Sequence, residues 1–366
     1  MWQGYAFAVD YREPQGHEHM LVDQQFTRRM TEFEQPGACL NCHASMPQVY
    51  DKLGNGDREA GFHAMNKLPY DKAAEHAGGP VACIDCHTPD TMELRVTRPA
   101  LIEGLKELKA GQGIADYDVN RDASTQEMRS YVCAQCHVEY YFAGDDKTLT
   151  FPWDKGLTVF DAIDYYDEVE WTDFTHTQTG SKVLKAQHPD FETWNQGIHA
   201  ANGVTCADCH MSYKRDGAAK ITDHNIATPM RSETTINQSC LTCHHSTASE
   251  MTERVETIQQ RWYDAQDVSF AAFDDLVRDL TAAVKDGSST PEQIEAARDF
   301  QRRASFVIDY SISENSKGFH APAYAISTLN QATDWSRKGQ LVLRGVDVEA
   351  SGGPVASTSP SPTPPR

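Results

Sequence analysis

The chain has 366 residues, of which 39% are hydrophobic, and a formal net charge of −20 at pH 7. Nucleic acid is therefore excluded as a partner, because its phosphates need a positive protein surface. No run of about 18 apolar residues occurs, so no membrane-spanning helix is expected.

The first 38 residues are polar and lead to Cys39-Leu40-Asn41-Cys42-His43, where a histidine follows two cysteines separated by two residues. The pattern recurs four times and uses all ten cysteines. This spacing is typical of covalent haem, because each thiol can add to one vinyl group while the adjacent imidazole reaches the iron. We therefore expect five covalently bound haem c groups. The other four motifs are Cys83, Cys86, His87; Cys133, Cys136, His137; Cys206, Cys209, His210; and Cys240, Cys243, His244.

Two other uses of the cysteines explain the pattern less well. Zinc sites use CxxC pairs but need no histidine directly after each pair. A disulfide framework suits an exported chain, yet cysteines this close together would close only small loops. Because haem is normally attached outside the cytoplasmic membrane, we expect a periplasmic or other extracytoplasmic protein. The first residues lack the basic and apolar regions of a signal peptide, so we expect that signal to precede Met1.

The motifs are too irregularly spaced for a repeat protein. Short helices and loops around haem predict a mainly α, multihaem cytochrome c domain with little β structure. We interpret the acidic stretch 161–173 as a solvated face rather than a metal site. Three parts are expected: a pentahaem-binding region with the active site at 1–246, long helices at 247–350, and a disordered Ser/Pro-rich tail at 351–366.

The long-helix region predicts three helices. From Met251 apolar residues alternate at spacings of four and three, which indicates one amphipathic helix ending near Gly287. A second, over 290–310, begins with a capping box and a proline in its first turn. The third is expected over 322–346. These helices either pack on the haem core or form a homodimer interface, and the sequence favours neither.

A low-spin electron-transfer haem needs a second axial ligand, usually histidine. If every iron has two protein ligands, the protein is an electron wire; if one lacks the second, that iron can bind a substrate. The sequence alone leaves this open. Ten histidines lie outside the motifs, namely His17, His19, His63, His76, His176, His188, His199, His224, His245 and His320.

Several stretches are specific enough to indicate a family. The chain closely resembles the pentahaem, ammonia-forming cytochrome c nitrite reductases over nearly its whole length. Many members carry lysine after the first CxxC, whereas this chain has His43 and so resembles a histidine subtype. The stretches that carry the resemblance are Gln15-Gly16-His17, Cys133 to Phe142 with Phe151-Pro152-Trp153, Leu184 to Pro189, Gly197-Ile198-His199, Thr222-Asp223-His224 and His320-Ala321-Pro322.

The resemblance implies that the haem on Cys39, Cys42 and His43 is catalytic and that the others are bis-histidine. The implied distal–proximal pairs are His224 with His87, His17 with His137, His320 with His210, and His199 with His244. The resemblance gives no role to His19, His63, His76, His176 or His245.

It also implies a distal pocket of Arg29, Tyr140 and His188, with Arg28 competing for the arginine role. One calcium ion would lie beside this pocket. Its implied ligands are the Glu139 carboxylate, the carbonyls of Tyr140 and Lys185, and the Gln187 side chain, all hard oxygen donors of the kind that calcium prefers.

The implied activity is the six-electron reduction of nitrite to ammonium in a homodimer. Its implied electron donor is a membrane-anchored multihaem quinol dehydrogenase, with a soluble multihaem protein as an alternative. Two rival functions are a pure electron-transfer cytochrome and a related oxidoreductase for sulfite, tetrathionate or hydroxylamine.

Overall fold

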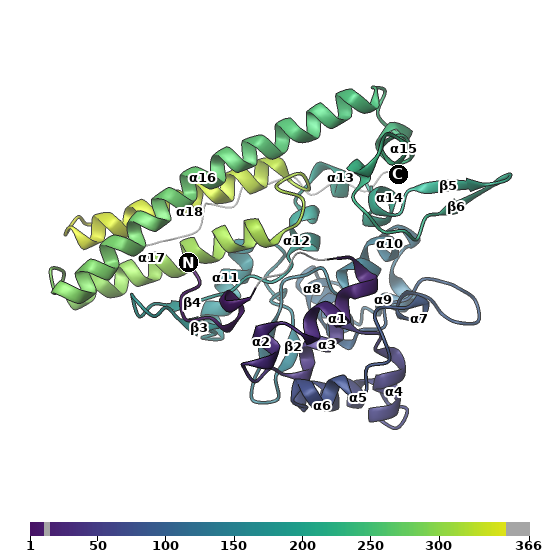
Figure 1. Cartoon of the computed structure of the whole chain (residues 1–366), viewed down its shortest axis with the longest axis horizontal. Helices are drawn as coiled ribbons and strands as arrows, with labels where there is room; N and C mark the ends of the chain where they lie inside the picture. Colours follow the sequence, from purple (N-terminus) through teal and green to yellow (C-terminus); the bar gives the residue numbers. More distant parts are fainter. Residues whose placement is uncertain (11–14, 349–366) are drawn as a thin grey trace.

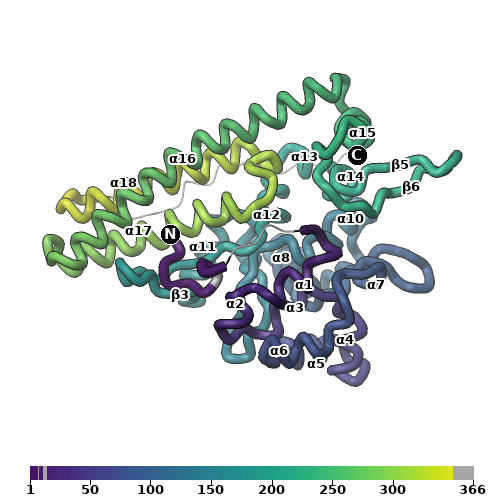
Figure 2. The backbone as a smooth tube through the Cα atoms, in the orientation of Figure 1, coloured from purple at the N-terminus to yellow at the C-terminus, as the bar shows by residue number. Residues whose placement is uncertain are grey.

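The computed structural model describes residues 1–10 and 15–348. The long helices α16 (Ala248–Asp286), α17 (Pro291–Ser313) and α18 (Pro322–Leu343) lie along one side, and a lobe of short helices and loops lies on the other (Figure 1). The tube in Figure 2 follows the chain through this lobe before it enters the long helices. The predicted tail at 351–366 lies outside the described residues.

Short helices separated by loops make up most of the lobe, as expected for a mainly α fold. In chain order they are α1 (Met20–Gln25), α2 (Arg28–Thr31), α3 (Leu40–His43), α4 (Pro47–Leu53), α5 (Arg58–Lys67), α6 (Tyr70–Ala74), α7 (Cys83–Cys86), α8 (Pro99–Gly111), α9 (Val119–Asp122), α10 (Thr125–Ala134), α11 (Val159–Glu168), α12 (Asp190–Asn195), α13 (Ile198–Ala201), α14 (Cys206–His210) and α15 (Glu233–Gln238), with 3₁₀ turns η1 (Ala6–Val9), η2 (His17–His19), η3 (Gly37–Cys39), η4 (Pro229–Arg231) and η5 (Cys240–Thr242).

The β-strands of the described residues form antiparallel hairpins. Strand β1 (Tyr141–Ala143) pairs with β2 (Thr148–Thr150), and β3 (Phe174–Thr175) pairs with β4 (Lys182–Val183). The third hairpin, β5 (Tyr213–Asp216) with β6 (Ala219–Thr222), projects from the lobe in Figure 1.

Each cysteine motif lies on a helical turn. The first, second, fourth and fifth coincide with α3, α7, α14 and η5, and the third follows from the end of α10. A helical turn suits the pattern because residues three apart lie on the same helix face. The paired thiols of a motif therefore point the same way, with the histidine at the end of the turn.

Local sequence signals match the start of each long helix and the end of the first, while the ends of the second and third differ by three residues. Thr247 caps α16 in a capping box with Glu250, and Gly287 ends it in the left-handed conformation at φ 69°. Thr290 caps α17 by accepting from the Gln293 amide at 3.3 Å. The second helix ends three residues later than 310, and the third ends at Leu343 rather than 346.

The apolar core has two parts. One fills the lobe around the first three motifs and includes Leu40, Phe151 and Trp153. The other joins the long helices to α11 and includes Phe306 and Trp335. The long helices thus pack on the rest of the chain through a shared core. Among the described helices, none combines the length and apolar character that crossing a membrane requires.

Candidate active site

Four motif histidines each face a second histidine ring at nearly the same separation. A metal–imidazole bond of about 2 Å on each side, plus about 1 Å from each nitrogen to its ring centre, separates two such centroids by about 6 Å. Each pair is therefore spaced to hold one iron, and these are the pairs that the resemblance implies. The centroid separations are 6.0 Å for His17 and His137, 6.1 Å for His87 and His224, 6.2 Å for His210 and His320, and 6.3 Å for His199 and His244.

Backbone carbonyls orient several of these rings. His87 Nδ1 donates to the Met92 carbonyl at 2.7 Å and His210 Nδ1 donates to Ala227 at 3.0 Å. A ring that donates from Nδ1 keeps the lone pair of Nε2 free and pointed away from that carbonyl. The ring tautomer required for iron ligation is thus set by the fold.

Two carboxylates that the sequence analysis missed orient two further rings. Asp190 lies 3.3 Å from His137 Nδ1, and Glu314 lies 2.6 Å from His320 Nδ1. The charge and hydrogen bond of Asp190 outweigh burial and raise the pKa of His137 to about 9. Asp190 lies 53 residues from His137, and Glu314 and His320 both lie in the connection between α17 and α18, where no local motif relates them.

The thiols bring neighbouring motifs together. All ten cysteines are free, so the disulfide alternative is not realised. The Cys42 side chain lies next to that of Cys136, and the Cys133 side chain lies next to that of Cys206. The third motif therefore adjoins both the first and the fourth, which places haems attached there close enough to exchange electrons.

The first motif differs from the others. His43 Nδ1 donates to the Met20 carbonyl at 3.0 Å, as an orienting bond should. Among the described residues, however, no second histidine ring lies opposite His43 at the spacing of the four pairs. Side chains of other residue types lie near this motif instead.

The two adjacent arginines have different environments. Arg28 is exposed and forms an ion pair with Glu32 at 2.8 Å. Arg29 is partly buried, and its positive charge acts on the Cys39 thiol and on His43, where it opposes protonation. Between the two candidates, the structure turns Arg29 toward the first motif and Arg28 toward solvent.

Tyr140 and His188 reach the same motif from the loops after α10 and β4. Burial raises the pKa of Tyr140 well above its usual range, and the charges of Cys42 and Cys39 act in the same direction. His188 has an exposed surface, but the protein atoms packed around its ring desolvate it and lower its pKa to about 4. At neutral pH both side chains therefore carry a proton that can be donated in a hydrogen bond.

The comparisons with known proteins agree on one family. The sequence matches the cytochrome c552 family over residues 1–362. Proteins named cytochrome c-552 from Parabacteroides distasonis and Porphyromonas gingivalis are 38% and 36% identical, over 94% of this chain and 68% and 67% of theirs. The chain belongs to the cytochrome c552 family. It is accordingly a multihaem c-type cytochrome, and the resemblance seen in the sequence is confirmed.

A solved structure supports the same assignment and the mainly α fold. Cytochrome c nitrite reductase from Desulfovibrio desulfuricans aligns with a TM-score of 0.83 and 29% sequence identity, over 94% of this chain and 74% of that one. That protein is described as a catalytic subunit with two calcium sites.

In this member of the cytochrome c552 family, the predicted calcium ligands meet beside Tyr140. The buried Glu139 carboxylate accepts from the Tyr166 hydroxyl at 2.9 Å and from the backbone N–H of Gln187 at 2.7 Å. The Gln187 side chain donates to the Lys185 carbonyl at 3.2 Å. Rotating the Gln187 side-chain amide by half a turn would put its oxygen, in place of its nitrogen, beside the Lys185 carbonyl oxygen.

Charge also favours a cation there. Burial raises the pKa of Glu139 well above its usual range, and the charges of Glu192 and Asp173 add to the effect. Burial raises the pKa of Glu192 to about 8 and that of Asp173 to about 6. The Lys185 ammonium is paired with Asp309 at 3.0 Å. A divalent cation would offset this surplus of buried negative charge, so the residues fit calcium.

Sequence reasoning missed three residues near this position. Asp173, interpreted as part of a solvated face, accepts from the Lys185 amide at 2.9 Å, and Glu192 accepts from the Glu139 amide at 2.9 Å. The Tyr5 side chain is hydrogen-bonded to Gln187. Tyr5 lies in a segment with no motif, so tertiary contacts alone reveal it.

The histidines without an implied role lie outside the four pairs. His19 and His245 are exposed, His76 is half-buried, and His63 is exposed beside Glu59 at 3.2 Å. His176 is buried and its Nδ1 lies 3.1 Å from the Thr179 hydroxyl.

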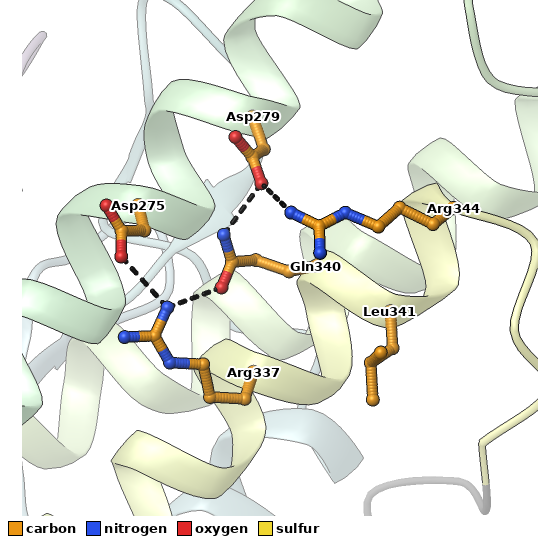
Figure 3. Close-up of a pocket in the computed structure, with 6 residues that line it drawn as sticks. All are labelled: Asp275, Asp279, Arg337, Gln340, Leu341 and Arg344. Carbon is orange, nitrogen blue, oxygen red and sulfur yellow. Dashed lines mark hydrogen bonds and ion pairs between the residues drawn. The ribbon is translucent and has the colours of Figure 1, made fainter.

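A surface cavity of about 450 Å³ lies between α16 and α18 and contains none of the predicted site residues (Figure 3). Its charged groups are paired across the two helices: Arg337 donates to Asp275 at 2.9 Å and Arg344 to Asp279 at 3.3 Å. These contacts join the helices, and we assign the cavity no role.

Proposed function

We propose that this protein reduces nitrite to ammonium, a six-electron reaction, at the haem attached through Cys39, Cys42 and His43. One observation carries the proposal: four motif histidines face a second imidazole, whereas His43 shares its surroundings with Arg29, Tyr140 and His188. Membership of the cytochrome c552 family and the similarity to a nitrite reductase support it.

The residues around the first motif suit an anion that gains electrons and protons. The haem supplies an iron with an open coordination position and the electrons that reach it. Arg29 offers a permanent charge and fixed donors to nitrite. His188, neutral at pH 7, donates a hydrogen bond to a substrate oxygen and favours its departure as water. Tyr140 adds a hydroxyl donor that stays protonated because burial raises its pKa.

The proposed calcium ion has a positioning and an electrostatic role. Glu139 and Gln187 would hold it together with the carbonyls of Tyr140 and Lys185. Those residues flank Tyr140 and His188, so a cation there would keep both donors in place. Its charge would also partly offset the overall charge of −20, which disfavours the approach of an anion.

The other four haems would deliver electrons to the first. We propose five covalently bound haem c groups, four of them bis-histidine, in a periplasmic homodimer. The proposed donor is a membrane-anchored multihaem quinol dehydrogenase or a soluble multihaem protein. The distance between two haem edges governs electron exchange, and the contacts of the third motif with the first and fourth provide a short route.

The test is a nitrite assay with reduced viologen that counts ammonium formed against electrons consumed. We expect one ammonium for every six electrons. Release of nitric oxide or hydroxylamine without ammonium would contradict the proposal. A fully haem-loaded protein that takes up electrons from viologen only until its haems are reduced, and that binds and consumes no nitrite, would instead support a pure electron-transfer cytochrome.

A further inference from the structure

A buried arginine joins the loops of the first two motifs. The Arg98 side chain is 2% exposed. Its Nε donates to the Asn41 carbonyl at 2.7 Å and its Nη2 to the Ala44 carbonyl at 3.0 Å, so it holds both sides of His43. Its Nη1 donates to the Asp85 carboxylate of the second motif at 2.7 Å.

The third motif joins the same network through Gln135. Gln135 Oε1 accepts from the backbone N–H groups of Thr97 at 2.7 Å and Arg98 at 3.2 Å. Its Nε2 donates to the backbone carbonyl of Asp85 at 3.2 Å. Asn41, Asp85 and Gln135 hold the same position in their motifs, directly before the second cysteine. Equivalent positions of three motifs thus converge on one residue: the Arg98 side chain binds the first two loops, and its backbone amide binds the third.

Local sequence places Arg98 where it can do this. It precedes Pro99, which begins α8, and a residue before proline is driven into the extended region. Its backbone is indeed extended, at φ −91° and ψ 116°. The guanidinium then presents several donors in a rigid plane, whereas a lysine ammonium could not reach the same acceptors with the same geometry.

Stability alone does not account for this arrangement. Desolvating two charges costs about as much as their attraction returns, so a buried ion pair adds little stability over apolar residues of similar volume. What the network supplies is a fixed geometry, because each side-chain hydrogen bond of Arg98 ends on one of the first two motif loops or on its own neighbour Thr97.

We propose that Arg98 is a positioning residue that fixes the attachment loops of the first three haems as one unit, and that its charge, together with that of Asp85, helps to set the reduction potentials of those haems. The role of the first haem as electron acceptor rests on the proposed function. The claim that Arg98 fixes the loops requires only that haem is attached at these motifs, not that the protein reduces nitrite.

The fourth motif offers a matched control. Asp208 also stands directly before the second cysteine, and it pairs with Arg129 at 2.7 Å. The Arg129 and Asp208 side chains are 16% and 32% exposed, and this pair joins α10, which leads into the third motif, to the fourth motif without contacting the first two. Replacing Arg129 therefore removes the same kind of charge from a place that does not link the first three loops.

The experiment compares R98K, R98M, the double variant R98M/D85N and the control R129M. Haem content is measured by intact mass, and potentials and iron environments by redox titration followed by visible and EPR spectra. These readouts need no nitrite, so they stand whether or not the protein reduces it. In R98M the unpaired Asp85 charge should lower the potentials of the first three haems, and in the double variant they should return toward the wild type.

R98K separates geometry from charge. It keeps the positive charge, so potentials should stay near the wild type, while the EPR signals of these haems broaden and electron transfer from reduced viologen to the first haem slows about tenfold. If R98M fails to bind haem, R98K carries the test. Wild-type spectra, potentials and transfer rates in both variants, or equal effects in R129M, would overturn the proposal.

Discussion

The pKa of His188 decides how this residue can act. Because burial lowers it to about 4, the imidazole is neutral at pH 7 and becomes protonated only as the pH falls toward 4. His188 is then a hydrogen-bond donor through its N–H, and its contribution should not vanish as the pH rises through 6.5, where an exposed histidine titrates.

We predict that His188→Asn lowers nitrite turnover about 100-fold, within the range for a positioned proton donor. The ratio of wild-type to variant kcat/KM should stay constant from pH 6 to pH 8. His63→Asn is the control, because His63 is exposed and outside the site. If the ratio of wild-type to variant kcat/KM falls about tenfold for each unit by which the pH rises, imidazolium is the active form.

Glu139 should control calcium binding. Glu139→Gln keeps the shape of the side chain but removes the charge that a cation neutralises. We expect a chelator to lower the Tm of the wild type, since a ligand at 100 times its Kd stabilises a protein by about 2.7 kcal/mol. The chelator should change the Tm of the variant far less, and Glu253→Gln, on the exposed face of α16, should behave like the wild type. Equal shifts in all three proteins would exclude Glu139 as a ligand.

Some site residues could be found from sequence and others could not. The five motifs follow from their spacing alone. The choice between Arg28 and Arg29 could not be made from sequence, because it depends on which face of a single helical turn meets the first motif. Asp190, Glu314 and Arg98 were missed because each acts on residues brought close by the fold.

At the scale of elements, Gly197 couples two segments that carry proposed haem ligands. It precedes α13, which carries His199, and a Cβ at this position would lie 2.0 Å from the carbonyl oxygen of His320. That contact is far shorter than van der Waals distance, so a methyl group must displace one segment or the other.

We predict that Gly197→Ala weakens iron ligation by both His199 and His320 and converts part of their haems from low to high spin. Visible and EPR spectra measure this change. Gly79→Ala is the control, because a Cβ there would meet nothing within 4 Å. Fully low-spin spectra in Gly197→Ala would show that the backbone relaxes without disturbing either ligand.

The helices were the most predictable elements. Capping boxes, a first-turn proline and a terminal glycine are local signals, so the start of α17 and the end of α16 followed from a few adjacent residues. The paths of the loops that carry the motifs were not predictable, because contacts with residues distant in sequence, such as Asp190 with His137, fix them.

At the scale of the whole molecule, the haem count and the ligand asymmetry make one joint prediction. Intact mass should exceed that of the polypeptide by five haem groups, and reductive titration should consume five electrons. EPR of the oxidised protein should show four low-spin haems and one haem whose signal changes when nitrite is added. Five unchanging low-spin haems would indicate an electron carrier.

The graded burial of the cysteines bears on how the protein matures. Cys39 and Cys42 are 6% and 8% exposed, whereas Cys83 and Cys243 are exposed. An enzyme that joins haem to a thiol must touch that thiol, and in the folded chain it could reach the outer motifs but not the first. If haem is attached at Cys39 and Cys42, that attachment must therefore precede closure of the lobe, whereas the outer motifs stay accessible afterwards.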